Sequence, residues 1–147
     1  MQLLWQTGKA YFADAEKQAA PFAADNLRAL EFVRRMDLAY AAADVVVSRA
    51  GALSVSELCL TGKPSVLVPS PNVAEDHQTK NALALTSKDA ALLVRDTDAA
   101  ATLYNEALAL LQNHARQQQL AANIRQLARP HATATIVDEL LKLVSGS

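Results

Sequence analysis

The sequence is poor in cysteine and glycine, and its charges nearly cancel. The single cysteine, Cys59, excludes an internal disulfide and leaves no Cys-x-x-Cys pair for structural zinc. The 14 basic and 15 acidic residues create no sequence-wide positive field, so nothing in the composition favours nucleic acid as a partner. The four glycines form neither Gly-x-x-x-x-Gly-Lys-Ser/Thr nor Gly-x-Gly-x-x-Gly, which removes the main support for ATP binding or classical dinucleotide binding.

Long hydrophobic runs are also missing. The apolar runs Ala41–Ala43 and Val45–Val47 are far too short to cross a bilayer. The first residues, MQLLWQTGKAYF, lack the basic and then apolar pattern of a secretory leader. We therefore expect a soluble chain in the cytoplasm, with 147 residues and a hydrophobic fraction of 51% that suit one globular domain.

Short apolar runs alternate with longer Ala- and Leu-rich stretches. This alternation predicts an α/β fold with a parallel, Rossmann-like sheet flanked by helices, followed by a helical C-terminal tail. Strands are expected at Leu3–Trp5 (buried), Leu27–Val33, Val45–Val47, Val66–Val68 and Ala91–Val94. Helices are expected at 10–20, Met36–Ala43, Ser54–Thr61, Gln78–Ser87, Thr97–Gln112, His114–Ala128 and Thr133–Val144. In such sheets ligands bind beyond the carboxyl ends of the strands, which directs attention to the loops there.

The segment Ser48–Glu57 carries the densest signal. A strand runs into a turn containing Gly51, and a helix with small side chains follows. The unpaired backbone N–H groups at the start of such a helix can bind an anion or a sugar hydroxyl. Glu57 is expected in the first turn of that helix, where an ionised carboxylate could accept hydrogen bonds from both hydroxyls of a ribose. The same residues also fit a capping box, in which Ser54 and Glu57 close the helix terminus.

The segment Pro69–Ala82 follows the next strand and carries the second signal. Asp76, His77 and Gln78 offer donors and acceptors that suit sugar hydroxyls. The alternative is a solvated loop whose Asp76 caps the following helix. No serine or cysteine nucleophile is paired with His77 in the sequence, so a catalytic role for this histidine has little support.

Taken together, Ala43–Glu57 and Asp76–Ala82 resemble the MurG family of bacterial glycosyltransferases. Trp5–Lys9 and the intervening Gly62-Lys63-Pro64 match that family too. The resemblance implies one half of a GT-B fold, in which two Rossmann-like domains face each other and the carboxy-terminal one binds UDP-N-acetylglucosamine. It also implies an inverting transfer of N-acetylglucosamine to lipid I, which forms lipid II in peptidoglycan synthesis.

The resemblance assigns a role to each candidate site residue. Val33 would contact the uracil through its backbone, and Glu57 would hold the ribose hydroxyls. His77 and Gln78 would hold the N-acetylglucosamine. The residues that would wrap the nucleotide are Ala52, Leu53, Ser54, Val55, Ser56 and Glu57. No catalytic residue, cofactor or metal is implied for this chain, because the base and the lipid I contacts belong to an amino-terminal acceptor domain that is absent here.

The resemblance also predicts how the domain is cut. Residues 1–147 would form a single UDP-sugar-binding domain that begins at its second strand and lacks the glycine-rich diphosphate turn. We expect the sheet to close by pairing Leu3–Trp5 directly with Val45–Val47. The full-length protein would be peripheral on the cytoplasmic face of the plasma membrane. Two alternatives are another GT-B nucleotide-sugar enzyme or a UDP-sugar epimerase, and a third is a non-catalytic flavodoxin-like binding module.

Overall fold

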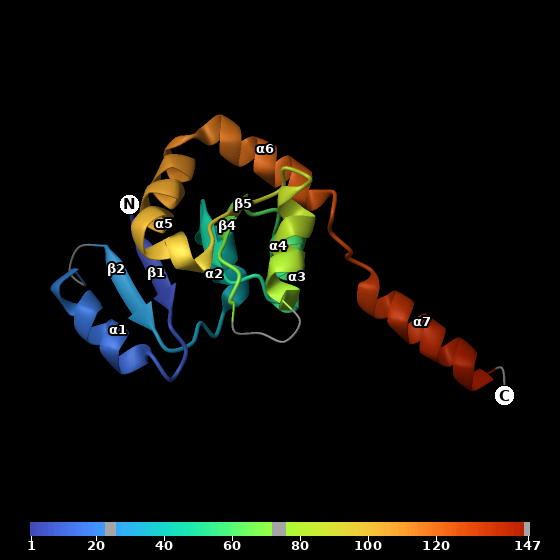
Figure 1. Cartoon of the computed structure of the whole chain (residues 1–147). Helices are drawn as coiled ribbons and strands as arrows, with labels where there is room; N and C mark the ends of the chain where they lie inside the picture. Colours follow the sequence, from blue (N-terminus) through green and yellow to red (C-terminus); the bar gives the residue numbers. More distant parts are fainter. Residues whose placement is uncertain (23–25, 72–75, 146–147) are drawn as a thin grey trace. The chain divides into compact units, whose positions relative to one another are not determined.

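The computed structural model describes residues 1–22, 26–71 and 76–145 (Figure 1). The chain forms two compact units, Met1–Ala42 and Ala43–Ser147. The first contains β1 (Leu3–Gln6), α1 (Phe12–Ala19), the short 3-10 helix η1 (Ala20–Phe22), β2 (Leu27–Leu30) and α2 (Met36–Ala42). The second contains β3 (Val46–Ser48), α3 (Ala52–Thr61), β4 (Ser65–Leu67), α4 (His77–Thr86), β5 (Leu92–Leu93), α5 (Asp96–Gln112), α6 (His114–Arg125) and α7 (Ala132–Ser145).

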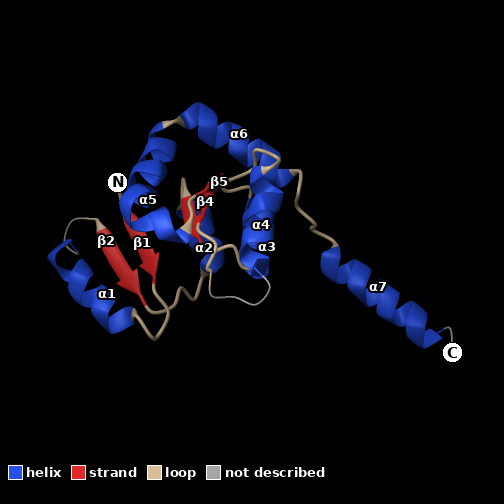
Figure 2. Ribbon diagram, viewed as in Figure 1, coloured by secondary structure: helices blue, strands red, loops and turns tan. Residues whose placement is uncertain are grey.

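The first unit is a two-stranded parallel sheet with a crossover helix. β1 and β2 pair in register from Leu3 opposite Leu27 to Gln6 opposite Leu30. α1 packs against β2 and buries two small residues, Ala15 and Ala19. The two strands run the same way (Figure 2). The residues that follow them, including Val33, therefore lie at one edge of this sheet.

β1 is not buried, contrary to the sequence prediction. Leu3, Leu4 and Trp5 are 50%, 47% and 40% exposed. The strand is as apolar as predicted, but in the described part of the chain β2 is its sole hydrogen-bonded neighbour. The prediction from apolar composition was therefore wrong, because a strand is buried only where other elements cover its faces and strands flank both of its edges.

The second unit is built around β4. Its sheet has the order β3-β4-β5 with all strands parallel, and the three residues of the central β4 are fully buried. Val66, Val68 and Val94 pack with Leu110 of α5 and Leu120 of α6. α3 packs against α4 and α6, and it ends at Gly62 with the left-handed φ of +65° that its predicted C-terminal glycine supplies.

The predicted pairing of Leu3–Trp5 with Val45–Val47 is wrong. In the described residues the hydrogen bonds give two sheets, with β1 paired to β2 alone and β3 to β4 alone. A Rossmann sheet has the order 3-2-1-4-5-6, so its second and fourth strands are not neighbours and the first strand separates them. The absence of a β1–β3 ladder among the described residues therefore does not follow the flavodoxin-like order that we expected.

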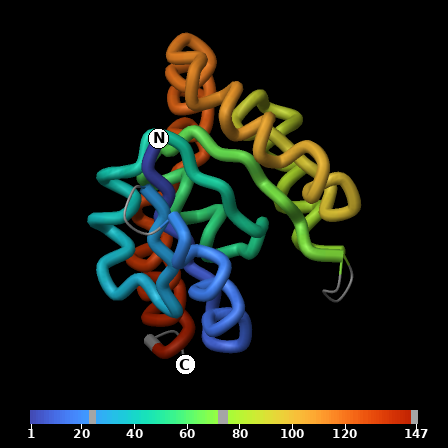
Figure 3. Tube along the Cα trace, turned by 90° about the vertical axis from the view of Figure 1, so that its left-hand side faces the viewer, coloured from blue at the N-terminus to red at the C-terminus, as the bar shows by residue number. Residues whose placement is uncertain are grey.

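The helical tail is confirmed. α5, α6 and α7 follow one another without an intervening strand. They form the yellow-orange to red end of the trace in Figure 3. α7 is exposed along its described side chains, including large apolar residues such as Leu143 and Val144. Among the described residues, no helix combines the length and the apolar character that crossing a bilayer requires.

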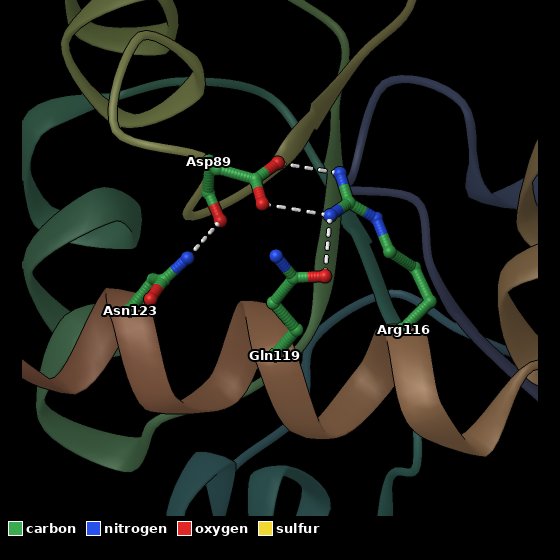
Figure 4. Close-up of polar contacts among 4 residues, drawn as sticks. All are labelled: Asp89, Arg116, Gln119 and Asn123. Carbon is green, nitrogen blue, oxygen red and sulfur yellow. Dashed lines mark hydrogen bonds and ion pairs between the residues drawn. The ribbon is translucent and has the colours of Figure 1, made fainter.

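Asp89 fastens α6 to the turn that precedes β5 (Figure 4). Its Oδ1 and Oδ2 accept hydrogen bonds from Arg116 Nη2 and Nη1 at 2.6 and 2.8 Å, and its carbonyl accepts one from Asn123 Nδ2 at 2.8 Å. Its φ of +52° lies in the left-handed region, which Asp and Asn tolerate best among non-glycine residues. The Arg116 guanidinium, chiefly by hydrogen bonding, holds the pKa of the Asp89 carboxyl below its usual value.

This depressed pKa predicts a pH-dependent contribution to stability. The folded-state pKa lies below the unfolded value of about 3.9, so the pair stabilises fully above that pH and its contribution disappears as the pH falls through the folded value. We expect Asp89→Asn, which retains the left-handed preference, to lower Tm at pH 7 and to lower it less at pH 2. Thermal unfolding followed by circular dichroism at both pH values tests this.

The control, Asp37→Asn, removes an exposed pair with Arg35 and should change Tm little. An equal Tm gap at both pH values would refute the expectation.

Candidate functional site

The start of α3 differs from the sequence prediction, and this difference affects the roles expected for Ser54 and Glu57. The helix begins at Ala52, two residues earlier than predicted, with Gly51 as its N-cap residue and no side chain capping it. Ser54 is therefore the third helical residue, and the capping box is wrong because it requires serine at the N-cap position. Glu57 is the sixth residue, so its predicted place in the first turn is wrong too. Ala52 and Leu53 are strong helix formers and extend the helix back to Gly51.

The predicted nucleotide-contacting residues form a largely exposed helical surface. Leu53 is 81% exposed, and Glu57, four residues later, lies on the same exposed face. Ala52 and Ser56 are also exposed, whereas Ser54 and Val55 are half-buried. Leu58 and Cys59 are buried, and burial raises the pKa of the Cys59 thiol, which fits a packing residue.

Gln78 lies in the first turn of α4, close to the end of β4. Its Oε1 accepts a hydrogen bond from the backbone N–H of Ser70 at 2.9 Å. A glutamine amide has one oxygen and one NH2 group, so this bond fixes which end of the amide remains for a ligand. Gln78 is thus held as a hydrogen-bond donor. The neighbouring His77 is exposed.

Asp76 does not cap α4 with its side chain, contrary to the alternative raised from the sequence. It occupies the N-cap position with a left-handed φ of +55°, and no side-chain hydrogen bond closes the helix. A typical N-cap residue has extended backbone angles that direct its side chain back to the helix, and this geometry differs from that. The preceding residues 72–75, quoted as part of the motif, lie outside the described residues.

Asn81 connects the two loops that the sequence singled out. Its Nδ2 donates to the carbonyl oxygen of Ala50 at 3.0 Å, and Ala50 is fully buried in the turn after β3. Asn81 and Gln78 are three residues apart on one face of α4. That face therefore holds the turn before α3 through Asn81 and the loop after β4 through Gln78. The sequence analysis quoted Asn81 within its motif but gave it no role.

Arg49 and Asp96 complete this edge. The sequence analysis quoted Arg49 within Ser48–Glu57 but gave it no role, and it did not mention Asp96. They form an ion pair, and Arg49 Nη1 also donates to the Val68 carbonyl at 3.3 Å. The arginine thus joins the ends of β3 and β4 to the start of α5. Asp96 belongs to an Asp-x-Asp sequence, but no group of three or more metal-ligating side chains is found in the described ranges.

Val33 lies in the first unit, just after β2, and is half-buried. Its backbone N–H donates to Gln6 Oε1 at 2.8 Å. Of the two backbone groups through which the resemblance could imply a base contact, the N–H is therefore already bonded within the chain. The structure brings the remaining candidates, Ala52–Glu57 and His77–Gln78, onto two packed helices of the second unit.

The bond from Asn81 to the buried Ala50 carbonyl makes a testable contribution to stability. Asn81→Ala leaves that carbonyl without its donor, and we expect a loss of ~1–3 kcal/mol in the free energy of unfolding. Urea denaturation measures this loss. The matched control is Asn105→Ala on the exposed surface of α5, which should change stability by less than ~0.5 kcal/mol. Equal, small effects of both substitutions would show that the Asn81 bond contributes nothing.

Comparison with known proteins places these features in one family. Two curated relatives, from Parabacteroides distasonis and Porphyromonas gingivalis, are 52% and 54% identical to this chain. Both are named UDP-N-acetylglucosamine--N-acetylmuramyl-(pentapeptide) pyrophosphoryl-undecaprenol N-acetylglucosamine transferase. Each match covers 98% of this chain, and the chain spans 39% and 38% of the two relatives.

A solved structure supports the fold. The crystal structure of Acinetobacter baumannii MurG is 31% identical with a TM-score of 0.84, and the match covers 97% of this chain and 41% of that one. This similarity confirms the predicted α/β, Rossmann-like class. Residues 1–136 match the glycosyltransferase family 28 C-terminal domain. The chain therefore belongs to the glycosyltransferase family 28 C-terminal domain family.

Proposed function

We propose that this chain is the donor-binding domain of a glycosyltransferase that moves N-acetylglucosamine from UDP to lipid I. The observation that carries the proposal is that two packed helices at one sheet edge carry complementary polar groups. α3 carries the exposed carboxylate of Glu57, and α4 carries Gln78, whose amide is oriented as a donor. The names of the curated relatives support the donor and the acceptor, since those names contain both.

Each helix would meet a different part of the donor. Glu57 on α3 would accept hydrogen bonds from the two ribose hydroxyls, because a carboxylate has two acceptor oxygens. The uncapped N–H groups at the start of α3 carry partial positive charge, which would favour a diphosphate nearby. Gln78, with His77, would hold the sugar, and its amide would donate to an oxygen of N-acetylglucosamine. In the first unit, the backbone at Val33 would meet the uracil.

This chain would bind and orient the donor without supplying the base. In an inverting transfer, a base removes the proton from the attacking hydroxyl, while hydrogen bonds stabilise the departing diphosphate. We assign no catalytic residue to residues 1–147, and the scheme needs no cofactor or metal from them. The acceptor contacts would come from the additional length that the relatives possess.

The domain assignment and the location follow from the same proposal. We propose that residues 1–147 act as one UDP-sugar-binding domain, which is supported by a family match that runs across both units. The acceptor in the relatives' name carries an undecaprenol chain. We therefore propose that the full-length protein works at the cytoplasmic face of the plasma membrane. The runner-up is another GT-B enzyme with a different nucleotide sugar, which competition between UDP-sugars would reveal.

Glu57→Ala tests the ribose contact. We expect UDP binding to weaken by ~1–3 kcal/mol, the scale of a lost hydrogen bond to a charged group. Stability should change little, because Glu57 is the sixth residue of α3 and lies beyond its first turn. Calorimetric titration with UDP and a thermal melt measure the two quantities, and Glu106→Ala on the exposed side of α5 is the matched control. Wild-type affinity in the Glu57 variant would remove the ribose role.

Gln78→Ala tests the sugar contact separately. We expect it to weaken UDP-N-acetylglucosamine while leaving UDP almost unchanged, because the amide donor would face the sugar. Gln78→Glu keeps an acceptor for the Ser70 N–H but replaces the outward donor by an oxygen, so it should lose the sugar preference as well. Competition between UDP and UDP-N-acetylglucosamine gives the ratio. Equal losses for both ligands would make Gln78 a purely structural residue.

A further inference from the structure

Asn81 bonds to the carbonyl of one particular peptide, the peptide that joins Ala50 to Gly51. Its Nδ2 donates to the Ala50 oxygen at 3.0 Å, and Ala50 is fully buried. The described residues contain no cis peptide bond, and a planar trans peptide directs its C=O and its N–H to opposite sides. The Gly51 N–H therefore points away from the Asn81 amide.

The Gly51 N–H is an unused donor at the carboxyl edge of the β3-β4-β5 sheet. No group within residues 1–22, 26–71 and 76–145 accepts a hydrogen bond from it. The Gly51 carbonyl, by contrast, is occupied, since it accepts from the Val55 N–H at 2.9 Å. The N–H is thus the polar group of Gly51 that remains for a ligand.

Glycine at position 51 leaves the orientation of this peptide dependent on a partner. Turning the peptide over, as a type I turn becomes a type II turn, would move the Gly51 φ from −64° into the left-handed region. Glycine adopts that region about as readily as the region of negative φ. The local backbone therefore permits both orientations, and the bond donated by Asn81 selects one of them.

We propose that Asn81 is a positioning residue, which holds the Ala50 carbonyl and so keeps the Gly51 N–H as a donor for an oxygen of the bound nucleotide sugar. The inference rests on the proposed function, because it needs that ligand beside the start of α3. Asn81 and Gln78 lie on one face of α4, and each controls one donor at the site. Gln78 supplies its own amide, whereas Asn81 acts through the backbone of Gly51.

Two substitutions and a matched control separate positioning from structural support. Asn81→Ala removes the side-chain donor, so the peptide should sample both orientations. Asn81→Asp keeps the shape but offers acceptors alone, so it should favour the reversed peptide, whose N–H would face the carboxylate. The control is Asn123→Ala on α6, because Asn123 Nδ2 donates in the same way to the Asp89 carbonyl at 2.8 Å. Asp89 precedes β5 and so lies at the opposite edge of the sheet from Gly51.

The first measurement needs no ligand. In the 15N-labelled chain, the nuclear Overhauser effect between the Gly51 N–H and the Ala50 Hα reports the peptide orientation, because turning the peptide over changes that distance. We expect Asn123→Ala to match wild type and Asn81→Asp to differ from it. Asn81→Ala should give an intermediate value.

The second measurement is a titration of the same proteins with UDP-N-acetylglucosamine. Asn81→Ala should weaken binding about three- to ten-fold, the scale of one hydrogen bond. Asn123→Ala should keep wild-type affinity, although it too loses a bond from an asparagine amide to a backbone carbonyl. Thermal melts of every variant establish that each titration is made on folded protein.

Three results would overturn the inference. An unchanged Overhauser effect in Asn81→Asp would show that the peptide orientation does not depend on Asn81. Wild-type affinity in Asn81→Ala would make Asn81 a structural support only, and equal losses in Asn81→Ala and Asn123→Ala would trace the effect to stability. Absence of binding by wild type would instead overturn the proposed function, while the ligand-free measurement still decides whether Asn81 orients the peptide.

Discussion

The buried strand β4 is the constraint on which the second unit depends. Ser65, Val66 and Leu67 are fully buried, and β3 and β5 pair with this strand in parallel. A parallel sheet places the carboxyl ends of all its strands at one edge. The loop after β4 and the turn after β3 therefore meet there, together with the helices that follow them. The candidate site is a consequence of strand direction more than of any single side chain.

Polar side chains hold that edge in shape by bonding to the backbone. Asn81 bonds to Ala50, Gln78 to Ser70 and Arg49 to Val68. Loops at a sheet edge cannot pair their backbone groups within a ladder, so side chains must satisfy them. At Gln78 the same arrangement orients the amide, because the oxygen bonded to the Ser70 N–H leaves the NH2 group as the outward donor. The hydrogen bond between Gln78 and Ser70 thus fixes both the loop after β4 and the end of the Gln78 amide that faces outward.

The helix that carries Glu57 shows how a local motif can suggest the wrong structure. Ser54 and Glu57 have the spacing of a capping box, yet α3 starts at Ala52, with Gly51 in the N-cap position and no side-chain cap. A capping motif states which side chains could bond, but where the helix begins depends on the turn after β3. Removing the capping role leaves Glu57 as an exposed carboxylate at the candidate site.

The sequence by itself determined the order of strands and helices, the parallel class and the two loops of interest. These features depend on periodicity, on turn residues such as Gly62 and on strand direction, all of which are local. Tertiary structure alone decided that β1 is exposed, that it does not pair with β3, and which atoms of Gln6 and Gln78 are engaged. Burial and hydrogen bonding between Gln6 and Val33, or between Gln78 and Ser70, depend on residues that only the folded chain brings together, so no local pattern encodes them.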